Sequence, residues 1–541
     1  MIDTKLLDAY VSELEALRVH GRDLARLYPD IAARLDIGPR RSRDPHVERV
    51  VESAAFLAAR LRMQVENQSN ELPMAVLGML APTLLEPVPA MATAGFVGGS
   101  EPQRIPRGTR FDLQFGGQAL VCMSTTMPLV ATPHSVRAAQ LGAQGVHADG
   151  ISIRLSGRPP QTLQLFIGSN AINAARLIDA LFEDLAAIQV IRPNDGGSTM
   201  LPPNRLRSLG FRPDDAALPV RATAHPAHRL VAEFIAFPEK FRFVSLTGAP
   251  FENGTEIRFL FARPLAFDRG LPHDLFSVNR VPVVNLWPTA ATPFDINGRQ
   301  LEYPVRVDAQ RYRIVECHSV EQMHLYGPDG GQPTRLDPML AAGEVLDTAI
   351  RWGTRRTVSR AGGEVMVHFQ GLDYRDLGQQ NFLAAPRVLA SNGDLPRRAR
   401  IGEPLYPVEG LGDWRAVLSS VPTAYHPALV DSQAMRTLIS YIQSSMTSLA
   451  SADQRGSLRH YLRQFPGSDA ATWIDAIGRV AVRPLATTRD GVPQSGLRVF
   501  VQFDSSRSRT TSRTLAKRVL AELLDSQRSL NRVEDVVVVT T

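Results

Sequence analysis

Residues 44–65 read DPHVERVVESAAFLAARLRMQV, and this stretch decides how the N-terminal part of the chain folds. Asp44 is a suitable N-cap and Pro45 suits the first helical position, so we expect a helix to begin here. The apolar residues of this helix are Val47, Val50, Val51, Ala54, Ala55, Leu57, Ala58, Leu61 and Val65. They form a face that is too wide for one neighbouring helix. The helix therefore packs inside a bundle of its own chain, or part of its apolar face packs against a second chain.

Two other helical patterns flank this stretch. Residues 4–28 carry apolar side chains three, four or seven positions apart, which is typical of an amphipathic helix. Residues 73–80 predict a third, short helix, and the prolines at positions 82, 87 and 89 end the helical region. We expect the two long helices to bury a core, part of it against a partner subunit, through Leu6, Tyr10, Leu14, Leu17, Val47, Val50 and Leu61. Each of these residues serves either that interface or a core within the chain.

The apolar period changes to two from residue 94 onward. Residues 111–115, 151–155 and 163–167 alternate as strands do, whereas residues 171–187 predict a helix. Near the C-terminus we expect helices at residues 428–449, 456–465 and 514–524, and strands at 497–501 and 536–539. These patterns predict an α+β multidomain fold, in which an N-terminal helical bundle precedes several β-rich, sandwich-like domains with short helices. The predicted divisions are residues 1–91, 92–193, 194–385 and 386–541.

Composition narrows the class of protein. The chain has 541 residues, 44% of them hydrophobic, and a formal net charge of +6. Almost all of its basic residues are arginine. Cys122 and Cys317 are the only cysteines, which excludes a disulfide framework of the secreted type. No signal peptide and no run of about eighteen apolar residues is present, so we expect a cytoplasmic protein. The arginine clusters within residues 40–43, 397–400 and 507–513 lack interleaved aromatic residues, so they contact acidic partners or solvent, and nucleic acid is not expected.

The common catalytic motifs are missing from the sequence. It has no Gly-rich phosphate loop, no zinc-protease motif, no nucleophile elbow and no Cys-x-x-Cys pair. His225 and His228 have a metal-like spacing, but we place them in a proline-containing loop without a third ligand. Cys317 and His318 would point to opposite faces of a strand, which does not favour a metal site. We therefore expect no catalytic residue, no metal and no cofactor.

The N-terminal motifs resemble those of the TssF (ImpG, VasA) family of type VI secretion system baseplate subunits. The similarity lies in Tyr10-x-x-Glu13-Leu14-x-x-Leu17-Arg18-x-x-Gly21, Tyr28-Pro29-x-Ile31-Ala32, Asp44-Pro45-x-Val47-Glu48-Arg49 and Ala55-Phe56-Leu57-x-Ala59-Arg60. Further along, Phe237-Pro-Glu-Lys240-Phe241 and Val281-Pro-Val-Val-Asn285-Leu286 look like two central motifs of that family. Ser391-Asn-Gly-Asp394-Leu-Pro396 departs from it, because Gly393 stands where arginine is usual.

The resemblance implies a structural role and no catalytic residue. Members of the family join a TssG-type partner, usually two copies to one, in a wedge. Six wedges surround the spike hub, seed the contractile tail, and contact TssK-type adaptors and a TssE-type sheath initiator. Contact with the inner membrane is then only indirect, on its cytoplasmic side, through the docked membrane complex. Two alternatives stay open: a baseplate protein of a phage-like or extracellular contractile injection system, and an enzyme on a β scaffold.

Overall fold

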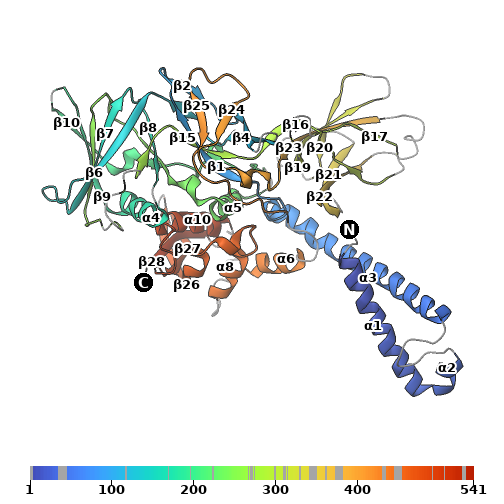
Figure 1. Cartoon of the computed structure of the whole chain (residues 1–541). Helices are drawn as coiled ribbons and strands as arrows, with labels where there is room; N and C mark the ends of the chain where they lie inside the picture. Colours follow the sequence, from blue (N-terminus) through green and yellow to red (C-terminus); the bar gives the residue numbers. More distant parts are fainter. Residues whose placement is uncertain are drawn as a thin grey trace.

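The structure is a computed structural model, and it confirms the predicted α+β multidomain class with N-terminal helices (Figure 1). It describes residues 4–34, 45–115, 119–168, 170–194, 196–221, 224–265, 267, 272, 275–297, 300–308, 312, 315–327, 331–339, 350–359, 362–371, 382–428, 434–443, 454–489, 492–504, 506–526 and 532–540. The predicted Asp44 N-cap and the arginines at positions 40–43 lie outside these residues.

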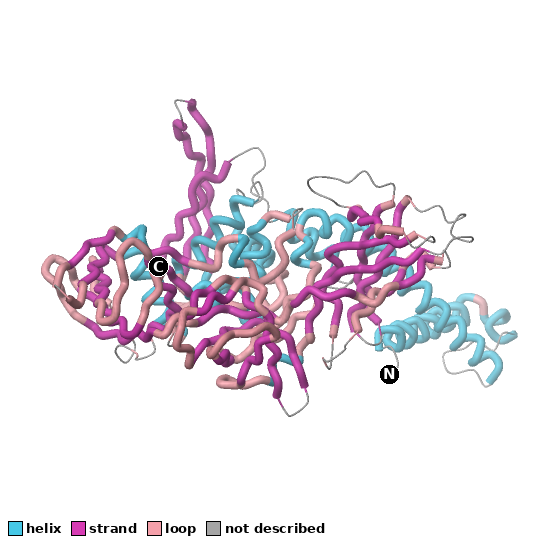
Figure 2. Tube along the Cα trace, turned by 90° about the horizontal axis from the view of Figure 1, so that it is seen from above, coloured by secondary structure: helices cyan, strands magenta, loops and turns pink. Residues whose placement is uncertain are grey.

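The N-terminal helices form an arm that extends away from the rest of the molecule (Figures 1 and 2). They are α1 Thr4–Leu27, α2 Pro29–Arg34 and α3 Pro45–Leu80. The expected separate helix at residues 73–80 is wrong, because α3 runs through Pro73 without ending. A proline inside a helix costs roughly 3 kcal/mol. Here Pro73 and Leu77 are buried at the base of the arm, and this packing offsets that cost.

A closed barrel lies at the centre of the body. Its strands, in order around the barrel, are β1 Met91–Val97, β15 Arg280–Val284, β4 Ala119–Thr125, β3 Arg110–Phe115, β24 Pro404–Pro407 and β25 Arg415–Leu418. These strands come from three of the four predicted segments, so the barrel ties distant parts of the chain together. The four domain boundaries themselves stay a prediction.

Two antiparallel sheets adjoin the barrel on one side. The first contains β10 Ser198–Leu201, β9 Leu185–Ile191, β13 Glu256–Phe261, β7 Asp149–Gly157 and β6 His134–Gln140. The second contains β11 Leu206–Ser208, β12 Phe243–Leu246, β8 Leu163–Ile167 and β14 Phe276–Ser277. A short pair is formed by β2 Gln103–Ile105 and β5 Leu129–Ala131. The associated helices are α4 Ala171–Asp179 and α5 Pro226–Ala236.

The predicted helix at residues 171–187 is too long. Helix α4 ends at Asp179, one π-helical turn covers Ala180–Asp184, and β9 then begins at Leu185. Residues 185–191 pair with β13 on one side and with β10 on the other. A short apolar run suits a buried strand as well as a helix, and here the pairing with β13 decides between them.

A wing of strands projects from the other side of the barrel (Figure 1). It comprises β16 Trp287–Ala290, β17 Phe294–Ile296, β18 Tyr303–Pro304, β19 Glu316–Tyr326, β20 Thr334–Pro338, β21 Arg351–Ser359, β22 Gly362–Gln370 and β23 Phe382–Ser391. The wing has a core of its own, to which Met323, Val367 and Ala384 belong.

The C-terminal part packs under the body. It contains α6 Ala434–Gln443, α8 Gln454–Leu462, α9 Trp473–Ala476, β26 Ile477–Arg489, β27 Val492–Phe503, α10 Arg513–Ser526 and β28 Arg532–Thr540. The strand order is β26-β27-β28, with β28 parallel to β27. Helix α6 covers the middle of the helix expected at 428–449, and the remainder of that helix lies largely outside the described residues. Short 3-10 turns occur at Pro82–Leu84, Pro203–Arg205, Pro213–Asp215, Pro238–Arg242, Leu395–Arg398 and Ser468–Ala470.

Candidate partner-binding surface

Helices α1 and α3 pack together as a two-helix hairpin. Ala55 and Ala59 are fully buried on α3, and their small side chains let the two helices approach closely. Two ion pairs cross the hairpin: Arg18 Nη2 lies 2.6 Å from Glu48 Oε1, and Arg62 Nη1 lies 2.9 Å from Glu13 Oε1. Such partly exposed pairs contribute about 0–1 kcal/mol each, so they fix the alignment more than they stabilise it.

The base of the arm is anchored to the body by polar contacts. Val88 and His426 exchange two backbone hydrogen bonds, of 2.8 and 2.9 Å. The Nε atom of Arg221 donates to Glu86 Oε1 at 2.7 Å, and its Nη1 atom donates to Glu321 Oε1 at 2.9 Å. Arg221 therefore links the end of the arm with strand β19 of the wing.

One face of α3 carries a row of apolar side chains that no described part of the chain covers. We name this row the outer stripe; it consists of Val47, Val50, Ala54, Leu57, Leu61, Leu72, Val76 and Met79. Its larger members are 55 to 72% exposed, except Val47 and Val76, which are half-buried. Successive members lie three, four or eleven residues apart, so all fall on one side of the helix. At 1.5 Å per residue the stripe is about 48 Å long.

The seven residues predicted to form an interface fall into two groups. Leu6, Tyr10, Leu14 and Leu17 are half-buried and lie on the side of α1 that packs on α3. Val47, Val50 and Leu61 belong to the outer stripe; Val47 is half-buried, and Val50 and Leu61 are 68% and 63% exposed. Sequence reasoning did not select Leu57, Leu72 or Met79, although their three-and-four spacing continues from Val50. The interface itself stays a prediction.

Charged residues beside the outer stripe are mostly arginine. Arg49 and Arg60 lie along one edge of it, eleven residues apart, and both are exposed. Neither forms an ion pair with any residue that the structure describes. Guanidinium groups bind carboxylates in a bidentate manner, so this edge suits a partner with acidic side chains.

A few ionisable groups of the body form a buried network instead. Glu233 of α5 accepts hydrogen bonds from the backbone N–H groups of Ala217 and Leu218, at 3.0 and 2.9 Å. The Nη1 atom of Arg229 donates to both oxygens of Glu233 at 2.9 Å, and Lys240 Nζ also donates to Glu233. Burial alone would raise the pKa of Glu233, but Lys240 and Arg229 together hold it below its ordinary value. Both cations of the network pair with Glu233 inside the body, which is what a structural role requires.

The residues considered for metal binding differ in burial: His228 and His318 are buried, whereas His225 is exposed. His225 is the N-cap of α5 and His228 lies within that helix, so the predicted loop is wrong. Burial lowers the pKa of His228 to about 4, and the neighbouring His225 adds to this effect. Cys122 and Cys317 do not form a disulfide. Among the described residues, no group of three or more His, Cys, Asp and Glu side chains is placed to hold a metal ion.

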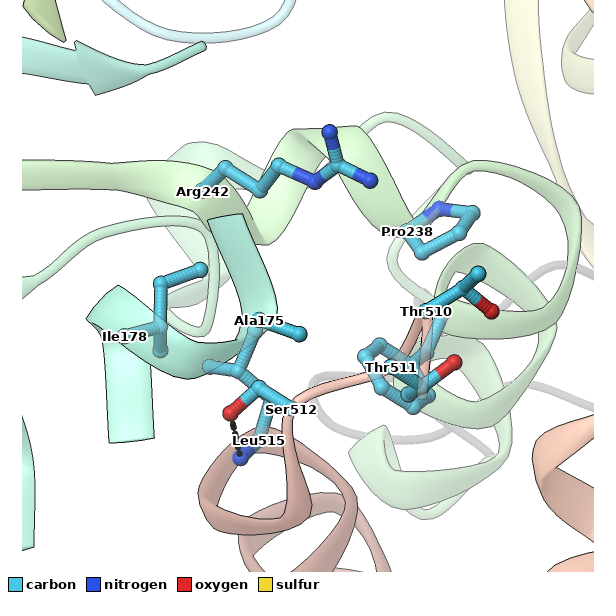
Figure 3. A pocket seen from close by; sticks show the side chains of 9 residues that line it. Ala175, Ile178, Pro238, Arg242, Thr510, Thr511, Ser512 and Leu515 are labelled. Carbon is cyan, nitrogen blue, oxygen red and sulfur yellow. Dashed lines mark hydrogen bonds between the residues drawn. The ribbon is translucent and has the colours of Figure 1, made fainter. Parts of the chain in front are cut away.

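A small hollow lies between α4, the end of α5 and the start of α10 (Figure 3). Arg242 extends over one side of it, and Ser512 on the opposite side accepts a hydrogen bond from the N–H of Leu515 at 3.2 Å. Its lining is otherwise apolar or hydroxylic and includes no carboxylate, histidine or thiol: Ala175, Ile178, Phe234, Pro238, Thr510 and Thr511. The hollow therefore lacks a general base and a nucleophile pair.

Comparisons with known proteins match this chain along almost its whole length. A family model described as type VI secretion system, TssF, matches residues 2–541. The type VI secretion system component TssF1 of Pseudomonas aeruginosa is 27% identical, across 100% of this chain and 97% of that protein. Within the described residues, no helix is both long enough and apolar enough to cross a membrane.

Two solved structures share the fold. A chain of the TssK-TssF-TssG baseplate subcomplex of the type VI secretion system superposes with a TM-score of 0.71 and 20% identity, covering 91% of this chain and 96% of that one. A chain of the baseplate complex from the type VI secretion system gives a TM-score of 0.60 and 20% identity, covering 97% of this chain and 94% of that one.

Proposed function

The chain belongs to the TssF family of the type VI secretion system, and from this premise we propose that it is a structural subunit of the baseplate whose helical arm binds a TssG-type partner. The main observation behind this proposal is the exposed outer stripe of α3. Contiguous exposed apolar surface on a soluble chain marks an interaction site. Apolar residues that alternate three and four apart along a helix are what a second helix packs against.

The direction of the arm supports the same role. Its outer part extends away from the body, so this part of α3 is open to a partner helix (Figure 1). The arginine edge of the outer stripe favours a partner helix with acidic flanks. One of the structurally similar chains comes from a TssK-TssF-TssG baseplate subcomplex, which supports TssG- and TssK-type subunits as partners of this chain.

Further contacts follow from the family resemblance rather than from any surface of this structure. We include in the proposal two copies of this chain per TssG-type subunit, a TssE-type sheath initiator, the spike hub, and assembly at the cytoplasmic side of the inner membrane. No catalytic role is part of the proposal, since strongly perturbed ionisable groups that the structure describes, such as Glu233 and His318, are fully buried.

Co-purification with the TssG-type partner tests the outer stripe. Leu57→Asp places a charge in its centre, where we expect binding to weaken by roughly tenfold or more. Because Leu57 is 58% exposed, the free energy of unfolding of the isolated chain should change by less than about 0.5 kcal/mol. Val146→Asp is the matched control, because Val146 is a 96% exposed apolar residue of the body.

Two results would contradict the proposal. If the Leu57→Asp chain unfolds in isolation, the residue belongs to an internal core. If that chain is folded and keeps its partner at full occupancy in native mass spectrometry, the outer stripe is not the interface.

A further inference from the structure

Helix α6 presents its apolar side to solvent and its polar side to the interior. Met435, Ile439 and Ile442 lie four and three residues apart and are 49%, 47% and 57% exposed. On the opposite side, Thr437 and Ser440 are 0% and 2% exposed. A surface helix of a soluble domain normally has the reverse orientation.

Contacts underneath the helix hold this orientation. Thr437 Oγ1 donates a hydrogen bond to Gln464 Oε1 at 3.0 Å. Ser440 Oγ is satisfied within the helix, where it donates to the carbonyl oxygen of Arg436 at 2.8 Å. The Tyr441 ring meets Tyr461 edge-on, with 5.8 Å between ring centroids. Turning the helix over would break the contacts of Thr437 and Tyr441, so the apolar side stays outward.

Helix α6 lies beside the body end of α3 (Figure 1) and packs against it. This end of α3 carries the last members of the outer stripe, among them Leu72 and Met79, which are 72% and 55% exposed. The base of the arm therefore brings two helical rows of exposed apolar side chains into one region, one row on α3 and one on α6.

We propose that α6 is a second docking surface, on which an amphipathic helix of the TssG-type partner continues from the lower end of the outer stripe. This inference rests on the proposed function. The spacing of Met435, Ile439 and Ile442 fits a helical occupant, which presents its own residues at the same intervals. Because α6 packs against the same end of α3, a partner helix that reaches the lower end of the outer stripe is close enough to extend onto α6.

Charge and size favour this occupant over a second copy of the chain. Helix α6 has one charged residue, the exposed Arg436, and no acid, and the edge of the outer stripe is likewise basic. One acidic-flanked partner helix complements both, whereas a copy of α6 would add a like charge. Three half-exposed side chains also bury far less than the ~1,000 Å² that a stable interface of its own requires.

Photo-crosslinking identifies the occupant directly. Ile439 is replaced by the photo-reactive residue p-benzoylphenylalanine in the purified complex of this chain with its TssG-type partner, and the complex is irradiated. We expect a crosslink to the partner, mapped by mass spectrometry to a helix. A crosslink to a second copy of this chain would overturn the inference, and so would the absence of any intermolecular crosslink.

Substitution measures what the contact contributes. Ile439→Asp should weaken partner binding by roughly tenfold while leaving the thermal unfolding of the isolated chain unchanged, and Val146→Asp should do neither. Unfolding of the Ile439→Asp chain, or full partner binding by it, would overturn the inference. If Leu57→Asp abolishes binding and Ile439→Asp does not, only the α6 surface is wrong. If neither substitution affects binding, the proposed function of the arm fails as well.

Discussion

Helices α5 and α3 are both rich in apolar residues, yet their surroundings are opposite. Nine of the eleven residues of α5 are buried, including the charged pair Arg229 and Glu233. Along α3, by contrast, most apolar side chains of the outer stripe are exposed and its arginine edge is unpaired among the described residues. Burial inside one chain requires every charge to find a partner there. An ordered apolar row that stays exposed is the kind of surface on which the proposed partner would pack.

The largest effect should come from breaking the charge network of α5. Lys240→Met removes a fully buried ammonium and leaves Glu233 with one cation fewer, so the body should lose roughly 3–5 kcal/mol of unfolding free energy. Urea unfolding followed by tryptophan fluorescence measures this loss. Lys517→Met, at an exposed lysine of α10, is the control and should have almost no effect. A loss below about 1 kcal/mol for Lys240→Met would show that the network does not hold the body together.

Acid should weaken the same region through His228. Its side chain is 1% exposed, and its pKa falls from 6.5 to about 4 in the folded protein. Between these values the unfolded chain binds a proton and the folded chain does not. The stability that depends on neutral His228 is therefore complete above pH 6.5 and is lost progressively toward pH 4. By the conversion of 1.36 kcal/mol per pKa unit, the loss is about 3 kcal/mol.

Unfolding curves recorded at several pH values in this range check that sign. His228→Phe should flatten the dependence on pH, because phenylalanine keeps an aromatic ring in the site and cannot bind a proton. His20→Phe, on the exposed side of α1, should leave the dependence as it is. An unchanged slope for His228→Phe would assign the acid sensitivity to other buried groups.

The smallest effect should be local to the arm. Ala59 is fully buried between α1 and α3, so Ala59→Leu should force the helices apart and destabilise the hairpin by roughly 1–3 kcal/mol. Hydrogen exchange should then speed up in α1 and stay unchanged in α5. Ala54→Leu is the matched control, because Ala54 lies exposed on the outer stripe. Faster exchange in α5 as well would show that the arm and the body unfold together.

Sequence reasoning located the helical arm because its periodicity is local. The spacing of Leu6, Tyr10, Leu14 and Leu17 identifies α1 without knowledge of any neighbour. Elements that depend on distant partners were less well predicted. Residues 185–191 form a strand because β13 pairs with them, and α3 continues through Pro73, where Pro73 itself and Leu77 are buried. Neither fact is encoded within a short window of sequence.

For the candidate site, the sequence by itself determined that α3 has more apolar surface than one neighbour can cover. The residue types and their three-and-four spacing are enough for that conclusion, and so are the motifs that place the chain in its family. Only the tertiary structure decided which side each residue takes. Ala55 and Ala59 meet α1, Leu57 faces solvent, and α6 turns its apolar row outward. Periodicity defines the faces of a helix, but only the packing of the other elements determines which face is left for a partner.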